Sequence, residues 1–433
     1  MSTFLLSVGT AVPPARLDQA RTRDFFAAQP GVDRLTSRLI GAAFDQSAIA
    51  SRYSVIGEIG SRSTRFSDDG ARLRAPSTGE RNALYRAEAP GLYAAASREA
   101  LARAGVDAAE VTHVVTASCT GFFAPGPDFL LVKELGIPRT APRVHVGFMG
   151  CAAAFPALRT AASICRAEPG AVVLVACAEL CSLHIRSSRD PEQIVASAVF
   201  GDGAGAAVVS STPPRGGRAA LEVGGFSTAL TSEGEHDMDW TIGDSGFEMR
   251  LTAEVPRIIG REIAGVVAEM LGAANPQSTE MAWAVHPGGR SVLDRVQDGV
   301  GLEEAAMAHS RAVLRDFGNM SSATILFILQ RILADASLAG GAPVAGLCFG
   351  PGLTVETARL SVHDGSREPA RAVVAAGRTR RPADGEDARP SGAADPGDAA
   401  AVPGAPIGRD AAGATATAAA PDRAVETAAP VAG

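Results

Sequence analysis

The most restrictive feature of this sequence is the alternation of short, β-branched apolar runs with longer segments of helical spacing. VTHVVTAS (111–118), AVVLVACAEL (171–180) and GAGAAVVSS (203–211) are such runs, and segments rich in Ala, Leu and Arg separate them. Apolar runs of this length are typical of buried strands, and strands that alternate with helices indicate an α/β architecture.

A second set of elements follows Leu221 and is similar in kind. It begins with LEVGGFS and includes MAWAVH (281–286) and VAGLCFG (344–350), with helical spacing over 255–271, 291–300, 303–316 and 323–338. The turn-forming stretch PPRGGR (213–218) separates the two sets. We therefore expect two similar halves, residues 1–212 and 213–365.

The last 68 residues, 366–433, differ in composition from the rest. Of these, 23 are Ala, 16 are Pro or Gly, and none is aromatic. Such a segment buries too little apolar surface to offset the entropy of ordering it, so a disordered tail is predicted. A tethering arm for a partner is the alternative.

Charge and composition exclude several classes of protein. The chain has 433 residues, 46% of them hydrophobic, which is enough for two to three domains. A net charge of −7 without a basic stripe argues against a nucleic-acid partner.

Neither a signal peptide nor a membrane span is expected. The N-terminus lacks a basic region, and no window of about 18 apolar residues occurs. The six cysteines form no CxxC pair or zinc-type spacing, so we expect free thiols in a reducing cytoplasm and no metal.

Cys151 is the most informative residue. A strand-like VHVGF run leads to Gly150, and an Ala-rich helical stretch follows the cysteine. This places the thiol at a strand-to-helix turn, where the helix dipole and unpaired N–H groups favour the thiolate and make it a nucleophile. The alternative is an inert, buried cysteine.

His286 and Asn319 lie at positions that suit catalytic groups. His286 ends an apolar strand and precedes Pro-Gly-Gly, and Asn319 lies in a Gly-Asn turn before an apolar helix. Asn319 would donate a hydrogen bond to a carbonyl or oxyanion. Taken singly, a core histidine and a helix N-cap explain them. Together with Cys151 they suggest a nucleophile, a base and an oxyanion donor.

Five motifs in order make the sequence recognisable: GFMGCAAA, AVFGDGAGA, AVHPGGRSVLD, GNMSSATILFIL and FGPGLTVE. The segment from about residue 5 to 362 resembles the type III polyketide synthases, the chalcone-synthase-like branch of the thiolase superfamily. The resemblance implies a five-layered α/β/α/β/α thiolase-like fold of two related halves. It also implies an acyltransferase that takes acyl-CoA and malonyl-CoA, needs no bound cofactor, and forms a homodimer.

The resemblance also assigns roles to residues. Cys151 would accept the starter acyl group, and His286 and Asn319 would bind the thioester carbonyl of malonyl-CoA and stabilise the enolate left by decarboxylation. His286 is expected to hold the Cys151 thiolate as an ion pair. Phe200 matches a phenylalanine at the junction of CoA tunnel and cavity, for which an ordinary core aromatic is the alternative. Gly350, Pro351 and Gly352 match a scaffold loop, and the candidate cavity walls are Cys119, Thr120, Cys181, His184, Trp240, Met249 and Ser321.

Two features depart from the family pattern. In plant members, several basic residues of an N-terminal helix bind CoA. The matching stretch here, RLIGAAFDQSAIASRY (38–53), has the neutral residues Ala42 and Gln46 between its arginines. Arg52 or Arg290 is therefore expected to contact the CoA phosphates. Ala124 stands where many members have a Met that crosses the dimer interface, so that contact is expected to be absent.

The predicted reaction is iterative decarboxylative condensation of malonyl-CoA on an acyl-CoA starter, followed by ring closure. Thr120 and Cys181 resemble the pattern of bacterial members that accept long fatty acyl-CoA starters, and this resemblance implies an alkylpyrone or alkylresorcinol product. Three alternatives stay open: a synthase that uses a short starter or malonyl-CoA alone, as naphthalene-forming members do; a condensing enzyme like the ketoacyl synthases that start fatty-acid synthesis; and a non-catalytic acyl-CoA-binding protein of thiolase fold.

Overall fold

The central sheet has two groups of strands. A computed structural model describes residues 2–57, 59, 65–67, 69–272 and 274–364, and the predicted tail lies outside these residues. In this part of the chain nine strands are linked in the order β11-β12-β13-β8-β1-β7-β6-β4-β5. β1 and β8 pair only at Phe4–Glu222 and Leu5–Leu221, so the two groups meet at a narrow junction.

The first group comes from the first half of the chain and the second group from the second half. The first contains β1 (Phe4–Ala11), β4 (His113–Ser118), β5 (Arg143–Gly147), β6 (Val172–Leu180) and β7 (Asp202–Ser210). The second contains β8 (Ala220–Leu230), β11 (Ala282–Val285), β12 (Pro343–Gly350) and β13 (Thr354–His363). β4 is parallel to both β5 and β6, and β11 is parallel to β12, whereas the remaining pairs are antiparallel.

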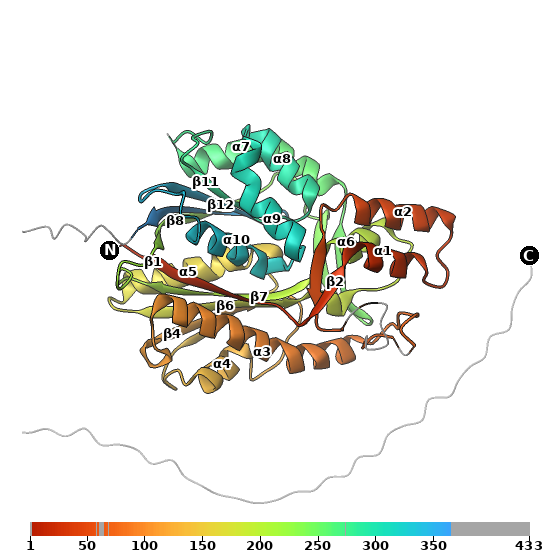
Figure 1. The fold of residues 1–433 in the computed structure, drawn as a ribbon, viewed down its shortest axis with the longest axis horizontal. Helices are drawn as coiled ribbons and strands as arrows, with labels where there is room; N and C mark the ends of the chain where they lie inside the picture. Colours follow the sequence, from red (N-terminus) through yellow and green to blue (C-terminus); the bar gives the residue numbers. More distant parts are fainter. Residues whose placement is uncertain (1, 58, 60–64, 68, 273, 365–433) are drawn as a thin grey trace, which may run out of the picture. The chain divides into compact units, whose positions relative to one another are not determined.

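Helices form three layers around these strands (Figure 1). Helices α3 (Thr78–Ala104) and α4 (Pro127–Leu135) cover the first group, and α7 (Glu254–Leu271), α8 (Arg290–Val300) and α9 (Ala308–Phe317) lie beside the second. α5 (Ala154–Ala167) and α10 (Thr324–Leu333) lie between the groups. Three separate clusters of buried apolar side chains fill the spaces between layers. The predicted α/β/α/β/α architecture is confirmed.

Smaller elements surround the end of the sheet where Cys151 lies. They are α1 (Gln19–Ala27), α2 (Arg34–Asp45), α6 (Pro191–Val199), the pair β2 (Ala15–Asp18) and β3 (Ser51–Ser54), and the hairpin of β9 (Met238–Gly243) and β10 (Gly246–Leu251). Short 3₁₀ turns are η1 (Ala108–Glu110), η2 (Gly150–Ala152), η3 (Cys181–His184), η4 (Glu304–Met307) and η5 (Ser321–Ala323). Among the described residues no helix is long and apolar enough to cross a membrane.

Local chemistry explains where the elements begin and end. Ser77 and Glu80 form a capping box at the start of α3, and Gly105 ends that helix in the left-handed conformation. The helix predicted over 323–338 stops at Leu333, because the Asp335 carboxylate accepts hydrogen bonds from the backbone N–H and the hydroxyl of Ser337 and favours a turn. The described residues of both predicted halves lie within one compact unit.

Candidate active site

Cys151 lies in the turn between β5 and α5, as predicted. The turn is tight: Phe148 and Gly150 both adopt positive φ, at 57° and 56°. A Cβ on Gly150 would lie 2.5 Å from Cδ of Pro351, so glycine is required both by conformation and by space. The loop at 350–352 therefore packs directly on the turn that carries the thiol, which agrees with its predicted role as a scaffold.

Asn319 is a polar neighbour of the thiol. Its amide nitrogen and its Oδ1 atom both lie 3.8 Å from Sγ of Cys151, and the amide nitrogen donates to the carbonyl of Gly288 at 3.3 Å. The Oδ1 atom accepts from the backbone N–H of Ser321 at 2.8 Å. Asn319 thus shapes its own turn and also places its amide group beside the sulfur.

His286 lies behind the cavity surface rather than on it. It follows β11 and is fully buried, and its Nε2–H donates to the carbonyl oxygen of Ser321 at 2.9 Å. Its Nδ1 atom has no hydrogen-bond partner among the described residues. The expected ion pair with the Cys151 thiolate is therefore not present in this structure, because the imidazole N–H is bonded to a backbone carbonyl.

Burial keeps both groups neutral in the resting site. Burial raises the pKa of Cys151 to about 11, and the hydrogen bonds of Ser321 and Asn319 only partly oppose this. Burial also lowers the pKa of His286 to about 4, against a smaller opposing effect of its backbone hydrogen bonds. At pH 7 the site holds a thiol and a neutral imidazole, which corrects the predicted low-pKa thiolate.

This protonation state predicts how the thiol reacts with an alkylating reagent. Only the thiolate is alkylated, so the rate at Cys151 should rise about tenfold per pH unit between roughly pH 7 and 10. Iodoacetamide labelling followed by peptide mass spectrometry measures this rate, with buried Cys165 as an internal comparison. A rate already constant below about pH 8 that becomes pH-dependent in His286→Ala would show an ion pair instead.

A cavity of about 760 Å³ opens in front of the thiol. Its lining is mainly apolar, and it contains most of the site residues predicted from the sequence: Cys119, Thr120, Cys151, Cys181, Phe200, Trp240, Met249, Arg290, Asn319, Ser321 and Pro351. Gly350 and Gly352 lie behind the lining; a Cβ on Gly350 would contact the Cys151 turn, at 3.0 Å from the carbonyl oxygen of Met149. Gly352, at φ 107°, donates its N–H to the carbonyl of Met238 in β9 at 3.3 Å.

Arg52 is buried and is not available to contact CoA, which leaves Arg290 of the two arginines named from the sequence. Its side chain is only 1% exposed and donates to Oε1 of Gln19 and to the carbonyls of Ser197 and Phe200. Burial lowers the pKa of Arg52 to about 10, with Asp202 opposing the shift. The guanidinium therefore anchors the chain around Phe200, a burial that the sequence does not show.

His184 is not a wall residue either. It is buried, its Nε2 donates to the carbonyl of Thr120 at 2.8 Å, and its Nδ1 accepts from the N–H of Phe247 at 3.0 Å. Its ring stacks on Phe247 at 4.4 Å between centroids. Burial lowers the pKa of His184 to about 3, so it acts as a neutral bridge behind the cavity.

Glu179 is a site-forming residue that the sequence analysis missed. This fully buried carboxylate accepts from Thr120 Oγ1 at 2.7 Å, from the N–H of Cys119 at 3.1 Å and from the hydroxyl of Ser322. It joins the Cys119–Thr120 wall to the turn that carries Asn319. Burial raises its pKa, although these hydrogen bonds oppose the shift. The signal in the sequence was an acid in the apolar strand 171–180.

Three arginines line the opening of the cavity. Arg257, Arg290 and Arg295 come from α7 and α8, and all three are exposed. The side of the opening formed by α2 contributes Leu39, Ala42, Ala43 and Gln46, which carry no charge. The arginine side chains at the opening therefore all lie on one side.

The layered fold and the half-buried Cys–Asn pair define a thiolase-like protein, and the comparisons with known proteins agree. Residues 2–213 match the N-terminal domain of chalcone and stilbene synthases and residues 226–363 the C-terminal domain. The chain belongs to the chalcone and stilbene synthase family, as the motifs predicted.

Known relatives show how far the similarity extends. "Probable polyketide synthase 1" of Dictyostelium discoideum is 29% identical over 362 residues, or 82% of this chain, and the chain spans 11% of that relative's length. The crystal structure of the C-terminal type III polyketide synthase domain of "Steely1" from Dictyostelium matches with a TM-score of 0.75 and 28% identity, over 83% of this chain and 99% of that one. The 1,3,6,8-tetrahydroxynaphthalene synthase of Streptomyces coelicolor matches with a TM-score of 0.74 and 25% identity, over 83% and 99%.

Proposed function

We propose that this chain is a type III polyketide synthase, an acyltransferase that extends an acyl group held on Cys151 with units from malonyl-CoA. The observation that carries the proposal is the Cys151 thiol, placed at a strand-to-helix turn, facing a cavity of about 760 Å³ and 3.8 Å from the Asn319 amide nitrogen. Membership of the chalcone and stilbene synthase family supports it.

Loading transfers the starter from CoA to the protein. Sγ of Cys151 attacks the thioester carbonyl, the CoA thiolate leaves and takes up a proton, and an acyl thioester forms on Cys151. The thiol must first lose its proton, since its raised pKa keeps it neutral. We assign His286 as the acceptor, because it is neutral and its Nδ1 lone pair has no partner among the described residues.

Extension needs a carbanion equivalent. Malonyl-CoA loses CO2, the electron pair of the broken C–C bond forms an enolate, and the enolate carbon attacks the acyl thioester, releasing Cys151. The Asn319 N–H would donate to the enolate oxygen where charge develops. His286 would add a second donor if its Nε2–H exchanged the Ser321 carbonyl for the substrate oxygen.

A long fatty acyl starter, with an alkylpyrone or alkylresorcinol as product, remains our proposal for specificity. The apolar lining from Met238, Trp240, Met249, Leu251 and Val255 supports it, since an alkyl chain is stabilised by burial against such side chains. The second candidate is a synthase that starts from malonyl-CoA, which the similarity to the Streptomyces naphthalene-forming enzyme supports.

One experiment separates these candidates. Purified protein is incubated with labelled malonyl-CoA and acyl-CoAs from acetyl to stearoyl, and products are identified by mass spectrometry. We expect alkylpyrones or alkylresorcinols with the long starters preferred. Products from malonyl-CoA alone would favour the second candidate, and no product from any starter would refute the proposed synthase.

We assign the CoA phosphates to the arginine side of the opening. Arg290, predicted from the sequence, lies 3.4 Å from Asp294, and Arg257 and Arg295 lie on the same side. Guanidinium groups suit phosphate because they donate paired hydrogen bonds.

The six cysteines, all free in the structure, support the cytoplasmic location inferred from the sequence.

The homodimer remains a proposal, and strand β5 is the surface we assign to it. β5 ends the order of the described sheet, pairs with β4 alone and exposes Val144 at 43%, and Met149, two residues beyond its end, is 37% exposed. An open strand edge with exposed apolar side chains pairs readily with a second copy. Ala124, also exposed, lacks the long side chain expected to cross such an interface.

The dimer prediction is tested by measuring mass in solution. Light scattering should give twice the 44.1 kDa chain mass. Val144→Lys should shift the protein towards monomer, because a buried unpaired charge at an interface is costly. Leu230→Lys is the matched control, since Leu230 is 74% exposed on β8. A monomeric wild type, or equal mass in all three proteins, would contradict the assignment.

A further inference from the structure

One wall of the cavity is a hairpin outside the main sheet. β9 and β10 form a separate two-stranded pair, in which Trp240 lies opposite Met249 and Met238 opposite Leu251. Side chains of residues that lie opposite each other on paired strands, or two positions apart on one strand, project from the same face of the hairpin. All four of these residues line the cavity. One face of the hairpin is therefore the surface that an alkyl chain meets.

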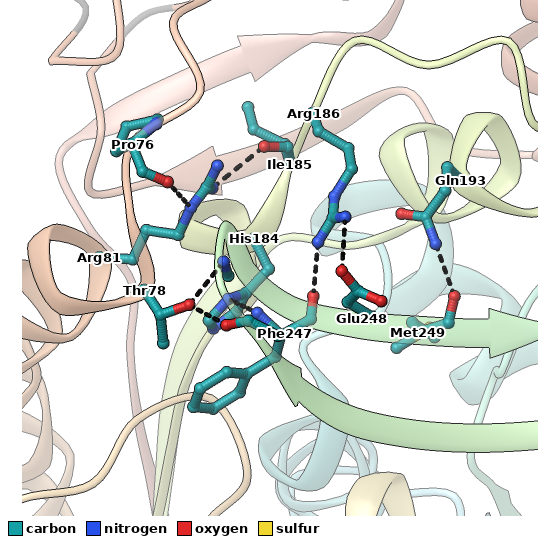
Figure 2. Close-up of polar contacts among 12 residues, drawn as sticks. Pro76, Thr78, Arg81, His184, Ile185, Arg186, Gln193, Phe247, Glu248 and Met249 are labelled. Atoms are coloured by element: carbon teal, nitrogen blue, oxygen red, sulfur yellow. Dashed lines mark hydrogen bonds and ion pairs between the residues drawn. The ribbon is translucent and has the colours of Figure 1, made fainter. Parts of the chain in front are cut away.

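The hairpin is held by side chains that bond its free edge, shown in Figure 2. The Phe247 N–H donates to Nδ1 of His184 at 3.0 Å, and Nη2 of Arg186 donates to the Phe247 carbonyl at 3.1 Å. Nε2 of Gln193 donates to the Met249 carbonyl at 2.7 Å. We call these three residues, His184, Arg186 and Gln193, the edge clamp.

The clamp matters because two strands alone are marginally stable in water. His184 and Arg186 fix the strand at Phe247, two residues away from the cavity residue Met249. Gln193 is the member that bonds the backbone of Met249 itself. It comes from α6, whose Ile194 and Val199 also line the cavity, so its amide sets the distance between two walls.

We propose that Gln193 is a positioning residue that determines which acyl chain lengths the cavity accepts. This inference rests on the proposed synthase function. Gln193 acts through the backbone: its hydrogen bond holds Met249 at a fixed distance from α6, and an alkyl chain of one length then fits best. Without the bond the Met249 wall relaxes, and chains of neighbouring length are accepted as well.

The test compares product distributions. Wild type, Gln193→Leu and Gln193→Glu receive malonyl-CoA and an equimolar mixture of hexanoyl- to stearoyl-CoA, and products are quantified by mass spectrometry. Because a single hydrogen bond is lost, the ratio of the preferred product to its neighbours should fall about 2- to 10-fold in both variants. Leu removes the donor, while Glu keeps the shape but lacks the N–H group. Gln277→Leu, an exposed glutamine in a turn, is the matched control.

A second readout separates positioning from general damage. Decarboxylation of malonyl-CoA without a starter depends on Asn319, which Gln193 does not contact, and should stay at the wild-type rate in both variants. An unchanged product ratio, or a loss of decarboxylation in parallel with condensation, would overturn the inference. If wild type condenses no acyl-CoA at all, the proposed function itself fails, which is a distinct result.

Discussion

Cys151→Ala should reduce condensation of malonyl-CoA with any acyl-CoA by about 1,000-fold or more, since the thiol proposed to hold the acyl chain as a thioester is lost. The five other cysteines are buried, and burial raises the pKa of their thiols as well, as it does at Cys177 and Cys348. None of them is expected to substitute as nucleophile. The measurement is the initial rate of product formation, together with mass spectrometry of the acylated protein.

A matched control distinguishes loss of the nucleophile from loss of packing. Cys165→Ala makes the same change in α5, at a fully buried position that does not line the cavity. We expect it to retain wild-type rates, with at most a modest loss of stability. Acylation of Cys151→Ala at another residue with full activity would refute the assignment. Residual decarboxylation in this variant would not, since that step does not use the thiol.

Removing the Asn319 donor should have the second largest effect. We expect Asn319→Leu and Asn319→Asp to lower the rate of malonyl-CoA decarboxylation by about 100- to 1,000-fold, because the N–H that faces the developing enolate is lost. Aspartate is the more informative change. It keeps an oxygen to accept the N–H of Ser321, which preserves the turn, but it places a carboxylate where a donor is required.

The control for this prediction is Asn275→Asp. Asn275 makes the same kind of turn, with Oδ1 accepting from the N–H of Gln277 at 3.0 Å, in an exposed loop that does not line the cavity. It should not change decarboxylation. If Asn319→Asp is as active as wild type, Asn319 serves only to shape the turn. Release of labelled CO2 measures the step directly.

Much of the fold could be predicted from local patterns. β6 and β7 coincide within a residue with their apolar runs, and α7 with the helical spacing over 255–271. These features depend on periodicity and burial of one element at a time, which the order of residues encodes directly. The α10 helix is shorter than predicted because a side chain-to-backbone bond at Asp335 competes with the helix.

The site was predicted in part. The turn that carries Cys151 is local, so strand, glycine and helix signals were sufficient to find it. The environment of each side chain is not local: the carbonyl of Ser321 is bonded to His286 from 35 positions away, and the carbonyls that surround Arg52 come from residues 197 and 200. These contacts determined that His286 is not paired with the thiolate and that Arg52 does not reach CoA.

The sequence by itself determined the family, the layered fold and the position of the thiol, because motif order and hydrophobic periodicity are properties of the chain. Only the tertiary structure decided the protonation of Cys151 and His286, the burial of Arg52 and Glu179, and the placement of His184 behind the cavity. The physical reason is that the energy of a charge or a hydrogen bond depends on desolvation and on partners that folding brings together.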